Sequence, residues 1–270
     1  MGATDAAPLR IAELTSHPQR VAASELLARI WRVPPAESPL PADLITALSR
    51  AGGCVLGAWT SGGTLVGVTV GFAGAPGSDR VYSYIAGVDA SAAGHGVGRR
   101  LKLAQRDWAL ERGAAVLTWT YDPLIRRNAH FNLNRLGAGV TRFIKNYYPP
   151  MLDPVNAGDR PDRFVVEWRL SEEPVGRPLP AEAATSPVVL AVEADMEPVL
   201  RLPGVDTAAL GTVRAWVPPD IEWLRMSHPK LGRRWRRSGR KVFRALFADG
   251  FRPVGIDADG HYVFVRGASS

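Results

Sequence analysis

A glycine-rich run is the part of this sequence with the clearest capacity for chemistry. Residues 94–100 read Gly-His-Gly-Val-Gly-Arg-Arg and separate an apolar segment from an amphipathic one. Alternating glycines leave the backbone N–H groups of a turn uncovered by side chains, and the positive end of a following helix strengthens their field. Two arginines stand beside them. The run therefore predicts a binding site for an anion such as a pyrophosphate.

The spacing of the glycines separates this run from two common phosphate-binding motifs. The dinucleotide fingerprint needs a glycine where this sequence has Arg99, and the P-loop needs a Gly-Lys-Ser/Thr ending that is absent here. Both nucleotide-binding folds are therefore disfavoured. A strand-to-helix turn that needs glycine for steric reasons alone is the alternative explanation.

The segments on either side of the run fit a strand and a helix. Residues 81–88 are rich in β-branched and aromatic side chains, which is typical of a buried strand. From Val97 to Trp108 apolar residues recur at helical spacing, and Gly113 ends the pattern. The charged residues of this helix, Lys102 among them, are expected to face water or ligand. The sequence thus predicts a strand, a glycine loop and a helix in that order.

A second strand and a second helix are predicted directly afterwards. Residues 115–121 have the composition of a strand, and Asp122 followed by Pro123 is typical of a helix start, with the aspartate as N-cap. The helix is expected to carry Asn128 on one stripe, and to end at Gly137.

Two stretches of this region resemble a known family. Residues 119–124 read Trp-Thr-Tyr-Asp-Pro-Leu, and residues 127–138 read Arg-Asn-Ala-His-Phe-Asn-Leu-Asn-Arg-Leu-Gly-Ala. Together with the glycine loop they resemble one branch of the GNAT superfamily of N-acyltransferases, over residues 81–140. Residues 93–98 are similar to the superfamily motif Gln/Arg-x-x-Gly-x-Gly/Ala, with Ala93 in place of the first residue.

The resemblance implies an acyl-CoA co-substrate, either acetyl-CoA or succinyl-CoA, and no metal. Some members of this branch accompany N-acylamino-acid racemases, and some are thought to transfer succinyl groups to amino acids. The function that the resemblance implies is acyl transfer to the amine of a small metabolite such as an amino acid, by direct attack in a ternary complex. The alternative is a non-catalytic acyl-CoA-binding or interaction module with a degenerate active site.

Cofactor-binding residues follow from the same resemblance. In this superfamily the pantetheine arm bonds to the main chain of the fourth strand, and loop amides hold the pyrophosphate. The residues so assigned are Ala86, Val88, His95, Gly96, Val97, Gly98, Arg99, Arg100 and Asn128. For Asn128 a helix-start cap explains the residue type equally well.

The catalytic groups depart from the family pattern. Tyr84 stands in the fourth strand where many members have Glu and nearer ones have His, and a neutral phenol is a poor base at neutral pH. Leu133 occupies the place of the tyrosine thought to protonate the leaving thiolate. The candidate substitutes are Tyr121, Tyr147, Tyr148 and His130. Our catalytic candidates are therefore Tyr84, Tyr121 and His130.

The order of predicted elements is β-α-α-β-β-β-α-β-α-β, which is the GNAT order and predicts a mixed α/β sheet. Besides the elements above we expect strands at 9–14, 54–59, 65–72, 140–147 and 164–170, and helices at 19–31 and 41–51. The predicted domains are a GNAT acyltransferase domain over 1–172, a linker over 173–187 and a smaller C-terminal α/β subdomain over 188–267. That subdomain is expected to hold strands at 188–193 and 212–217, a basic helix ending at Gly250, and a hairpin of 251–256 with 262–265.

Composition limits the class of protein. The chain has 270 residues, of which 46% are hydrophobic and 22% charged, enough for a substantial core. Its single cysteine, Cys54, excludes an internal disulfide and a cysteine-based zinc site, and its apolar neighbours predict a core position. No apolar stretch approaches the roughly 20 residues of a membrane span, and the N-terminus does not resemble a signal peptide. We expect a cytoplasmic enzyme, with a homodimer as the default assembly.

The net charge of +7 is concentrated in one segment. Nine lysines and arginines and no acidic residue lie between Arg225 and Arg244, so the rest of the chain is close to neutral. Apolar residues on the same segment predict a packed helix with a solvated basic face, which is the interpretation we favour. These residues are Leu231, Trp235, Val242, Leu246 and Phe247. A counter-charge for acyl-CoA and a nucleic-acid contact are the alternatives; the latter lacks aromatic interleaving or a recognition motif and is disfavoured.

Overall fold

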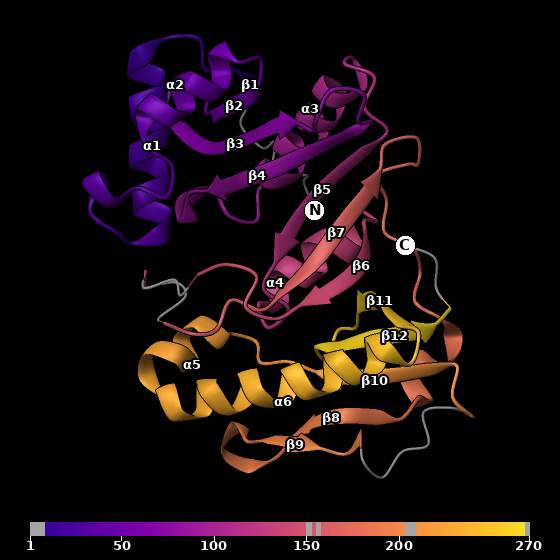
Figure 1. Ribbon diagram of the computed structural model, residues 1–270. Helices are drawn as coiled ribbons and strands as arrows, with labels where there is room; N and C mark the ends of the chain where they lie inside the picture. Colours follow the sequence, from indigo (N-terminus) through magenta and orange to yellow (C-terminus); the bar gives the residue numbers. More distant parts are fainter. Residues whose placement is uncertain (1–8, 150–152, 155–157, 203–208, 268–270) are drawn as a thin grey trace, which may run out of the picture. The chain divides into compact units, whose positions relative to one another are not determined.

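The computed structural model describes residues 9–149, 153–154, 158–202 and 209–267. The chain forms two compact units (Figure 1). The N-terminal unit contains residues 1–118 and 169–171, and the C-terminal unit contains residues 119–168 and 172–270. Each unit is described by itself below.

The N-terminal unit is built on strands in the order β1-β2-β3-β4-β5, with β5 continuing into the C-terminal unit. Its strands are β1 (Arg10–Glu13), β2 (Cys54–Trp59), β3 (Leu65–Ala73), β4 (Arg80–Val88) and the start of β5 (Val116–Tyr121). The pairs from β1 to β4 are antiparallel, whereas β4 pairs with β5 in parallel. Its helices are α1 (His17–Trp31), α2 (Ala42–Arg50) and α3 (Val97–Leu110), with 3-10 turns η1 (Pro35–Glu37) and η2 (Ala90–Ala92).

Helices α1 and α3 pack on opposite faces of this sheet, and glycines allow their close approach. A Cβ atom on Gly87 would lie 2.8 Å from Ile30 Cδ1 of α1, whereas one on Gly67 would lie 2.9 Å from Leu101 Cδ1 of α3. Gly67 pairs with Val88, the neighbour of Gly87, and successive residues of a strand point to opposite faces. Both faces of the sheet are thus covered, as the mostly buried patterns of β2 and β3 require.

The C-terminal unit contains the end of β5 and a second sheet. Strand β7 (Arg163–Arg169) lies between β5 and β6 (Gly139–Ile144), and helix α4 (Arg126–Ala129) continues as the π-helical segment η3 (His130–Arg135). The second sheet has the order β11-β12-β10-β8-β9. Its strands are β8 (Val188–Val192), β9 (Pro198–Leu200), β10 (Thr212–Trp216), β11 (Phe251–Ile256) and β12 (His261–Arg266). The remaining elements are η4 (Ala181–Thr185), η5 (Ala194–Met196), α5 (Ile221–Ser227) and α6 (Pro229–Ala248).

An aromatic cluster joins these parts of the C-terminal unit. The ring of Phe243 in α6 lies 5.2 Å from that of Phe164 in β7 and 5.9 Å from that of Phe264 in β12. Tyr262 of β12 packs against Phe164 and Phe243, and its hydroxyl donates to the carbonyl of Pro123 at 2.8 Å. Helix α6 therefore shares one core with β7 and with the second sheet.

The predicted fold class is confirmed, including the extra α/β region at the C-terminus, but two local predictions are wrong. Asp122 does not cap a helix, because α4 begins only at Arg126 and its N-cap is Ile125. Lys102 does not face water, because its side chain lies beneath the sheet with 4% of its surface exposed. The predicted domain boundaries, at 172 and 188, differ from the limits of the compact units and stay a prediction.

Candidate functional site

The glycine loop of the N-terminal unit presents backbone amides at the start of α3. Gly94 and Gly96 have φ angles of 80° and 75°, and a Cβ atom on either would meet nothing within 4 Å. Glycine is therefore required at both positions because of the positive φ angle, and not because a larger side chain would clash. The hydrogen bond from Arg100 N–H to the Gly96 carbonyl, 3.0 Å long, is the first of the helix. The amides of Val97 and Gly98 precede that bond, as in other anion-binding helix starts.

The side chains of the loop are arranged to leave this backbone accessible. His95 is exposed, whereas Val97 is buried and anchors the loop to the core, so Val97 can offer a ligand only its backbone. The guanidinium of Arg100 donates to the carbonyl of Leu9. Before the loop, Asp89 caps η2 by accepting a hydrogen bond from the Ser91 amide at 3.0 Å. The Ser91 side chain and amide hold the pKa of Asp89 below its usual value.

Strand β4 has an irregularity at Tyr84. The register with β3 pairs Val70 with Ile85 and Gly71 with Ser83, so Tyr84 is the extra residue of a β-bulge. Bulges are frequent next to active sites, where they re-aim a side chain. The Tyr84 ring is 42% exposed and lies 6.3 Å from the ring of Phe72. The structure thus places the first catalytic candidate at an accessible point of this strand.

The parallel ladder between β4 and β5 is short. It consists of three pairs, the last joining Tyr82 to Thr118, whereas β4 continues to Val88. Beyond Tyr82, β4 continues to pair with β3, and Ala86 is exposed. The backbone groups of β4 that face away from β3 in this stretch are therefore not used by the described part of the β4–β5 ladder. An extended ligand can bond to such groups as an added strand does.

A buried polar group lies under β4 within the same unit. The Lys102 ammonium donates to Ser83 Oγ at 2.6 Å and to Gln105 Oε1 at 3.3 Å. Burial lowers the pKa of Lys102 to about 7. Burial also raises the pKa of the nearby Cys54 thiol to about 12. Cys54 is fully buried, as predicted from its neighbours, and a thiol with so high a pKa is not a nucleophile at neutral pH.

The other predicted site residues belong to the C-terminal unit. Tyr121 is buried, its hydroxyl accepts a 3.4 Å hydrogen bond from Tyr262, and burial raises its pKa well above the usual value. His130 is exposed in the π-helical segment. Asn128 is half-buried in α4; it does not cap that helix, whose N-cap is Ile125. The site roles of these three residues stay predictions.

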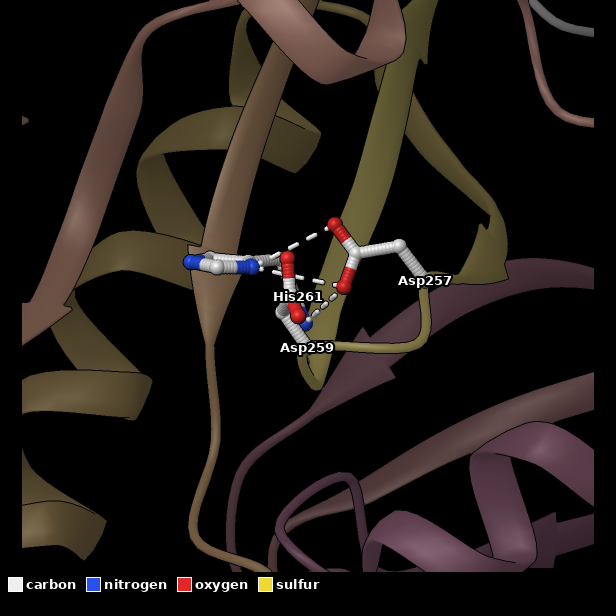
Figure 2. A group of neighbouring side chains, drawn as sticks. All are labelled: Asp257, Asp259 and His261. Atoms are coloured by element: carbon white, nitrogen blue, oxygen red, sulfur yellow. Dashed lines mark hydrogen bonds and ion pairs between the residues drawn. The ribbon is translucent and has the colours of Figure 1, made fainter.

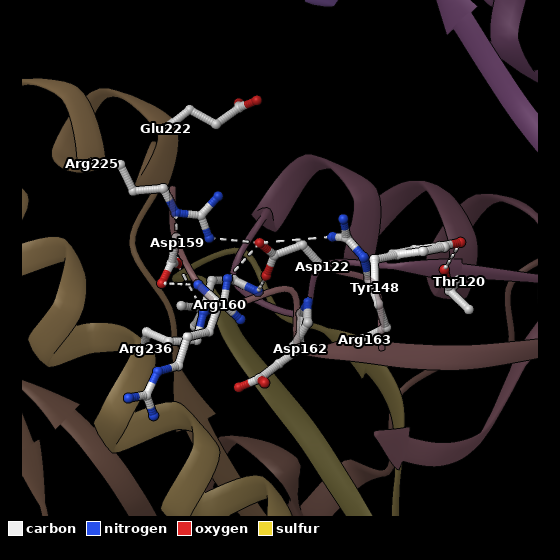
Figure 3. Close-up of polar contacts among 12 residues, drawn as sticks. Thr120, Asp122, Tyr148, Asp159, Arg160, Asp162, Arg163, Glu222, Arg225 and Arg236 are labelled. Atoms are coloured by element: carbon white, nitrogen blue, oxygen red, sulfur yellow. Dashed lines mark hydrogen bonds and ion pairs between the residues drawn. The ribbon is translucent and has the colours of Figure 1, made fainter. Parts of the chain in front are cut away.

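The basic segment contributes to a buried ion-pair cluster that the sequence analysis missed (Figure 3). Arg225 Nη2 and Arg236 Nη2 both donate to Asp122 Oδ2 at 2.6 Å. The Nε atoms of the same two arginines lie 3.0 and 2.9 Å from Asp159 Oδ2. Arg163 Nη1 lies 4.0 Å from Asp122. Although burial would raise the pKa of Asp122, these arginines lower it well below the usual range.

A further ion pair extends this cluster along α6. Arg240 Nε donates to Asp162 Oδ2 at 2.8 Å. The interpretation of the whole segment as a solvated face is therefore wrong for Arg225 and Arg236, which are buried, although Arg233, Arg237 and Arg244 are exposed. A signal was present in the sequence, because Arg236 falls at helical spacing with the buried Gly232 and Gly239.

Three side chains at the β11–β12 turn have the composition of a metal site (Figure 2). Ligand atoms of Asp257, Asp259 and His261 lie within 4.8 Å of one another. Asp257 Oδ1 accepts from the His261 amide at 2.8 Å and lies 3.3 Å from His261 Nδ1, and Asp257 Oδ2 lies 3.8 Å from Arg214 Nη1. These contacts, made within the second sheet, account for the closeness of the three side chains.

One family model and several solved structures are similar to part of this chain. The family described as "Acetyltransferase (GNAT) domain" matches residues 12–124. A candidate acetyltransferase from Acinetobacter baylyi superposes with a TM-score of 0.51 at 16% identity, covering 63% of this chain and 94% of its own. A candidate GNAT-family acetyltransferase from Desulfovibrio desulfuricans has a TM-score of 0.50 at 14% identity, covering 61% and 100%. These two similarities show a GNAT-like fold. No curated protein matches the chain.

A third solved structure is that of the ribosomal-protein-S18-alanine N-acetyltransferase from Escherichia coli, with 17% identity and a TM-score of 0.49 over 64% of this chain and 99% of its own. Among the described residues, no helix has both the length and the apolar character needed to cross a bilayer.

Proposed function

We propose that this chain is an acyl-CoA-dependent N-acyltransferase that transfers an acetyl or succinyl group to the amine of a small metabolite such as an amino acid. One observation carries the proposal: within the N-terminal unit, β4 has a bulge at Tyr84, extends past its ladder with β5, and leads to a glycine loop at the start of α3. The match of residues 12–124 to a GNAT acetyltransferase domain supports it.

The loop residues suit the phosphates of an acyl-CoA. The amides from His95 to Arg99 would hold the pyrophosphate, and the charges of Arg99 and Arg100 would favour it. The backbone groups of Ala86 and Val88 would bond to the pantetheine arm in the manner of an added strand. The role of Asn128 in binding rests on the family resemblance alone.

The chemistry that these residues would serve is attack of a neutral amine on the thioester carbonyl. A C–N bond forms, the tetrahedral intermediate collapses with cleavage of the C–S bond, the nitrogen gives up one N–H proton to become an amide, and the thiolate takes up a proton. The amine must lose a proton to solvent or to a base before attack. Backbone N–H groups of β4 would stabilise the oxyanion, a contribution of about 3–4 kcal/mol per donor in well-studied sites.

Of the three catalytic candidates, Tyr84 is the one best supported by its surroundings. Its phenol is accessible on β4, where it could orient the amine or a water that receives the proton. Tyr121 is a poorer acid, because burial raises the pKa of its hydroxyl. His130 is exposed and keeps the role that the sequence gave it, as an alternative acid or base.

One observation favours the second candidate function, a non-catalytic acyl-CoA-binding module. Leu133, which replaces the usual tyrosine, is 2% exposed and packed in the core, so it leaves no polar group in its place. The two functions differ in turnover. The enzyme proposal expects release of free thiol from acetyl-, propionyl- or succinyl-CoA in the presence of an amine panel; CoA binding without thiol release would refute it.

The loop assignment is tested separately, by CoA binding. The variant Gly98→Asp places a carboxylate against the pyrophosphate, and a unit charge at about 4 Å costs about 4 kcal/mol at a partly exposed site, or roughly 1,000-fold in affinity. Gly98→Ala is the matched control, because it adds a side chain without charge at a helical position. Equal affinities of Gly98→Asp and the unchanged protein for CoA, measured by calorimetry, would contradict the assignment.

A further inference from the structure

A pocket lined mainly by arginines lies in the C-terminal unit, and its lining includes none of the residues assigned above to acyl transfer. Its volume is about 200 Å³. It is formed by α5, α6 and the segment that precedes β7. The charged residues of its lining are Asp159, Arg160, Arg225, Arg233, Arg236 and Arg237. Five arginines thus line the pocket.

The buried part of the lining has an unsatisfied donor. Arg225 is 5% exposed and is held between Asp122 and Asp159, as Figure 3 shows. Its third nitrogen, Nη1, is buried and has no hydrogen-bond partner among the residues that the structure describes. Buried guanidinium N–H groups are expensive to leave unpaired. A ligand oxygen in the pocket would supply the missing acceptor.

The charge of the lining is not balanced by its own carboxylate. Asp159 is already engaged by Arg225 and Arg236, both of which are buried. Arg233 and Arg237, one turn apart on α6, are exposed at the rim together with Arg160. Anions are attracted to such a recess, since its arginines are close together and partly desolvated.

The local fold keeps these arginines in place. Gly232 allows α5 to approach α6 closely, because a Cβ atom on it would lie 3.2 Å from Arg225 Cα. Arg236 bonds to Asp159 and to Asp122, which fixes the wall before β7 against α6. The buried arginines are therefore pre-organised, which lowers the entropic cost of binding.

We propose that this pocket binds a small molecule through a carboxylate or phosphate group, with Arg225 Nη1 as the buried donor and Arg233 and Arg237 as rim contacts. Planar guanidinium groups suit both kinds of oxyanion, because they can donate two parallel hydrogen bonds. This proposal concerns the C-terminal unit by itself and does not rest on the proposed acyltransferase function.

The test is calorimetric titration of the full chain carrying Gly98→Asp, so that the glycine loop does not compete for the probe. Inorganic phosphate and succinate are titrated separately, which distinguishes the two oxyanions. We expect saturable binding of at least one of them. Adding Arg233→Glu with Arg237→Glu should weaken that binding about tenfold or more. The control adds Lys241→Glu with Arg244→Glu, which makes the same change of charge on exposed residues of the same helix outside the pocket.

Three results would overturn the proposal. One is absence of saturable binding of either probe at millimolar concentrations, and another is equal weakening by the control pair. The third is salt-sensitive binding of duplex DNA that the rim pair abolishes while neither small anion binds, which would assign the surface to nucleic acid. A further variant, Arg225→Lys, keeps the charge and removes the Nη1 donor, and should weaken binding if it folds; if it does not, the rim pair decides.

Discussion

Lys102 gives the structure's sharpest quantitative prediction, because it is a lysine buried under β4. Burial lowers its pKa to about 7 in the folded chain, from an ordinary value of 10.5. Between these values the unfolded chain binds more protons than the folded one. The free energy of unfolding therefore rises with pH in this window, and below about pH 6 Lys102 contributes no pH dependence.

The magnitude follows from the two pKa values. Between pH 7.0 and 8.5 the contribution of Lys102 changes by about 2 kcal/mol, since one pKa unit corresponds to about 1.4 kcal/mol and the group is half titrated at the lower limit. Cys54 sets the upper limit of this pH window. Burial raises the pKa of its thiol to about 12, from an ordinary value of 9.0. Above 9.0 the thiol therefore lowers the free energy of unfolding as the pH rises.

The assay is urea unfolding at pH 7.0 and 8.5, followed by circular dichroism, on the unchanged chain and on Lys102→Met. Met preserves the length of the side chain without a titratable group. The difference in unfolding free energy between the two proteins should change by about 2 kcal/mol between the two pH values. Lys241→Met, at an exposed position of α6, is the control and should show no such change. A difference for Lys102→Met that is constant with pH would refute the reasoning.

Two further predictions concern the C-terminal unit. Asp122→Asn removes the charge that compensates two buried arginines, and should lower the free energy of unfolding by about 3–5 kcal/mol in urea titrations; a loss under about 1 kcal/mol would contradict the cluster's role. Gly137→Ala puts a Cβ atom into the carbonyl of a neighbouring segment at a φ of 70°. It should lower the free energy of unfolding by at least about 2 kcal/mol more than the control Gly94→Ala does. The φ angle of Gly94 is also positive, but a Cβ atom there meets nothing. Equal melting temperatures of the two variants would contradict the prediction.

The elements of this fold were largely predictable from sequence, because each is specified by local patterns. The hairpin of β2 and β3 has alternating and β-branched apolar residues around a Ser-Gly-Gly turn, and the observed strands begin at the predicted Cys54 and Leu65. The glycine loop was found for the same reason. Its two positive φ angles are a property of residues that stand next to one another in the chain.

The parts that could not be predicted depend on residues distant in the sequence. The bulge at Tyr84 exists only in the register of β4 against β3, which no single strand specifies. Asp122 followed by proline has the pattern of a helix start, and its Oδ1 does accept from the Leu124 amide at 2.9 Å, but α4 begins only at Arg126 and the Oδ2 atom pairs with Arg225 and Arg236. Lys102 lies on the buried side of α3, where its contacts with Ser83 and Gln105 come from the fold and not from the helical pattern.

The ion pair between Asp122 and Arg225 joins residues 103 positions apart, which has a consequence for how the chain is made. During synthesis the carboxylate emerges long before its arginines, and it stays hydrated until α5 and α6 leave the ribosome. Phe164 of β7 likewise cannot pack against Phe243 until α6 has been synthesised. Contacts of such separation form late and slow the folding of a domain. Residues up to 118 belong to the N-terminal unit and can therefore begin to fold early, whereas residues from 119 onward are expected to need chaperone protection until the chain is complete.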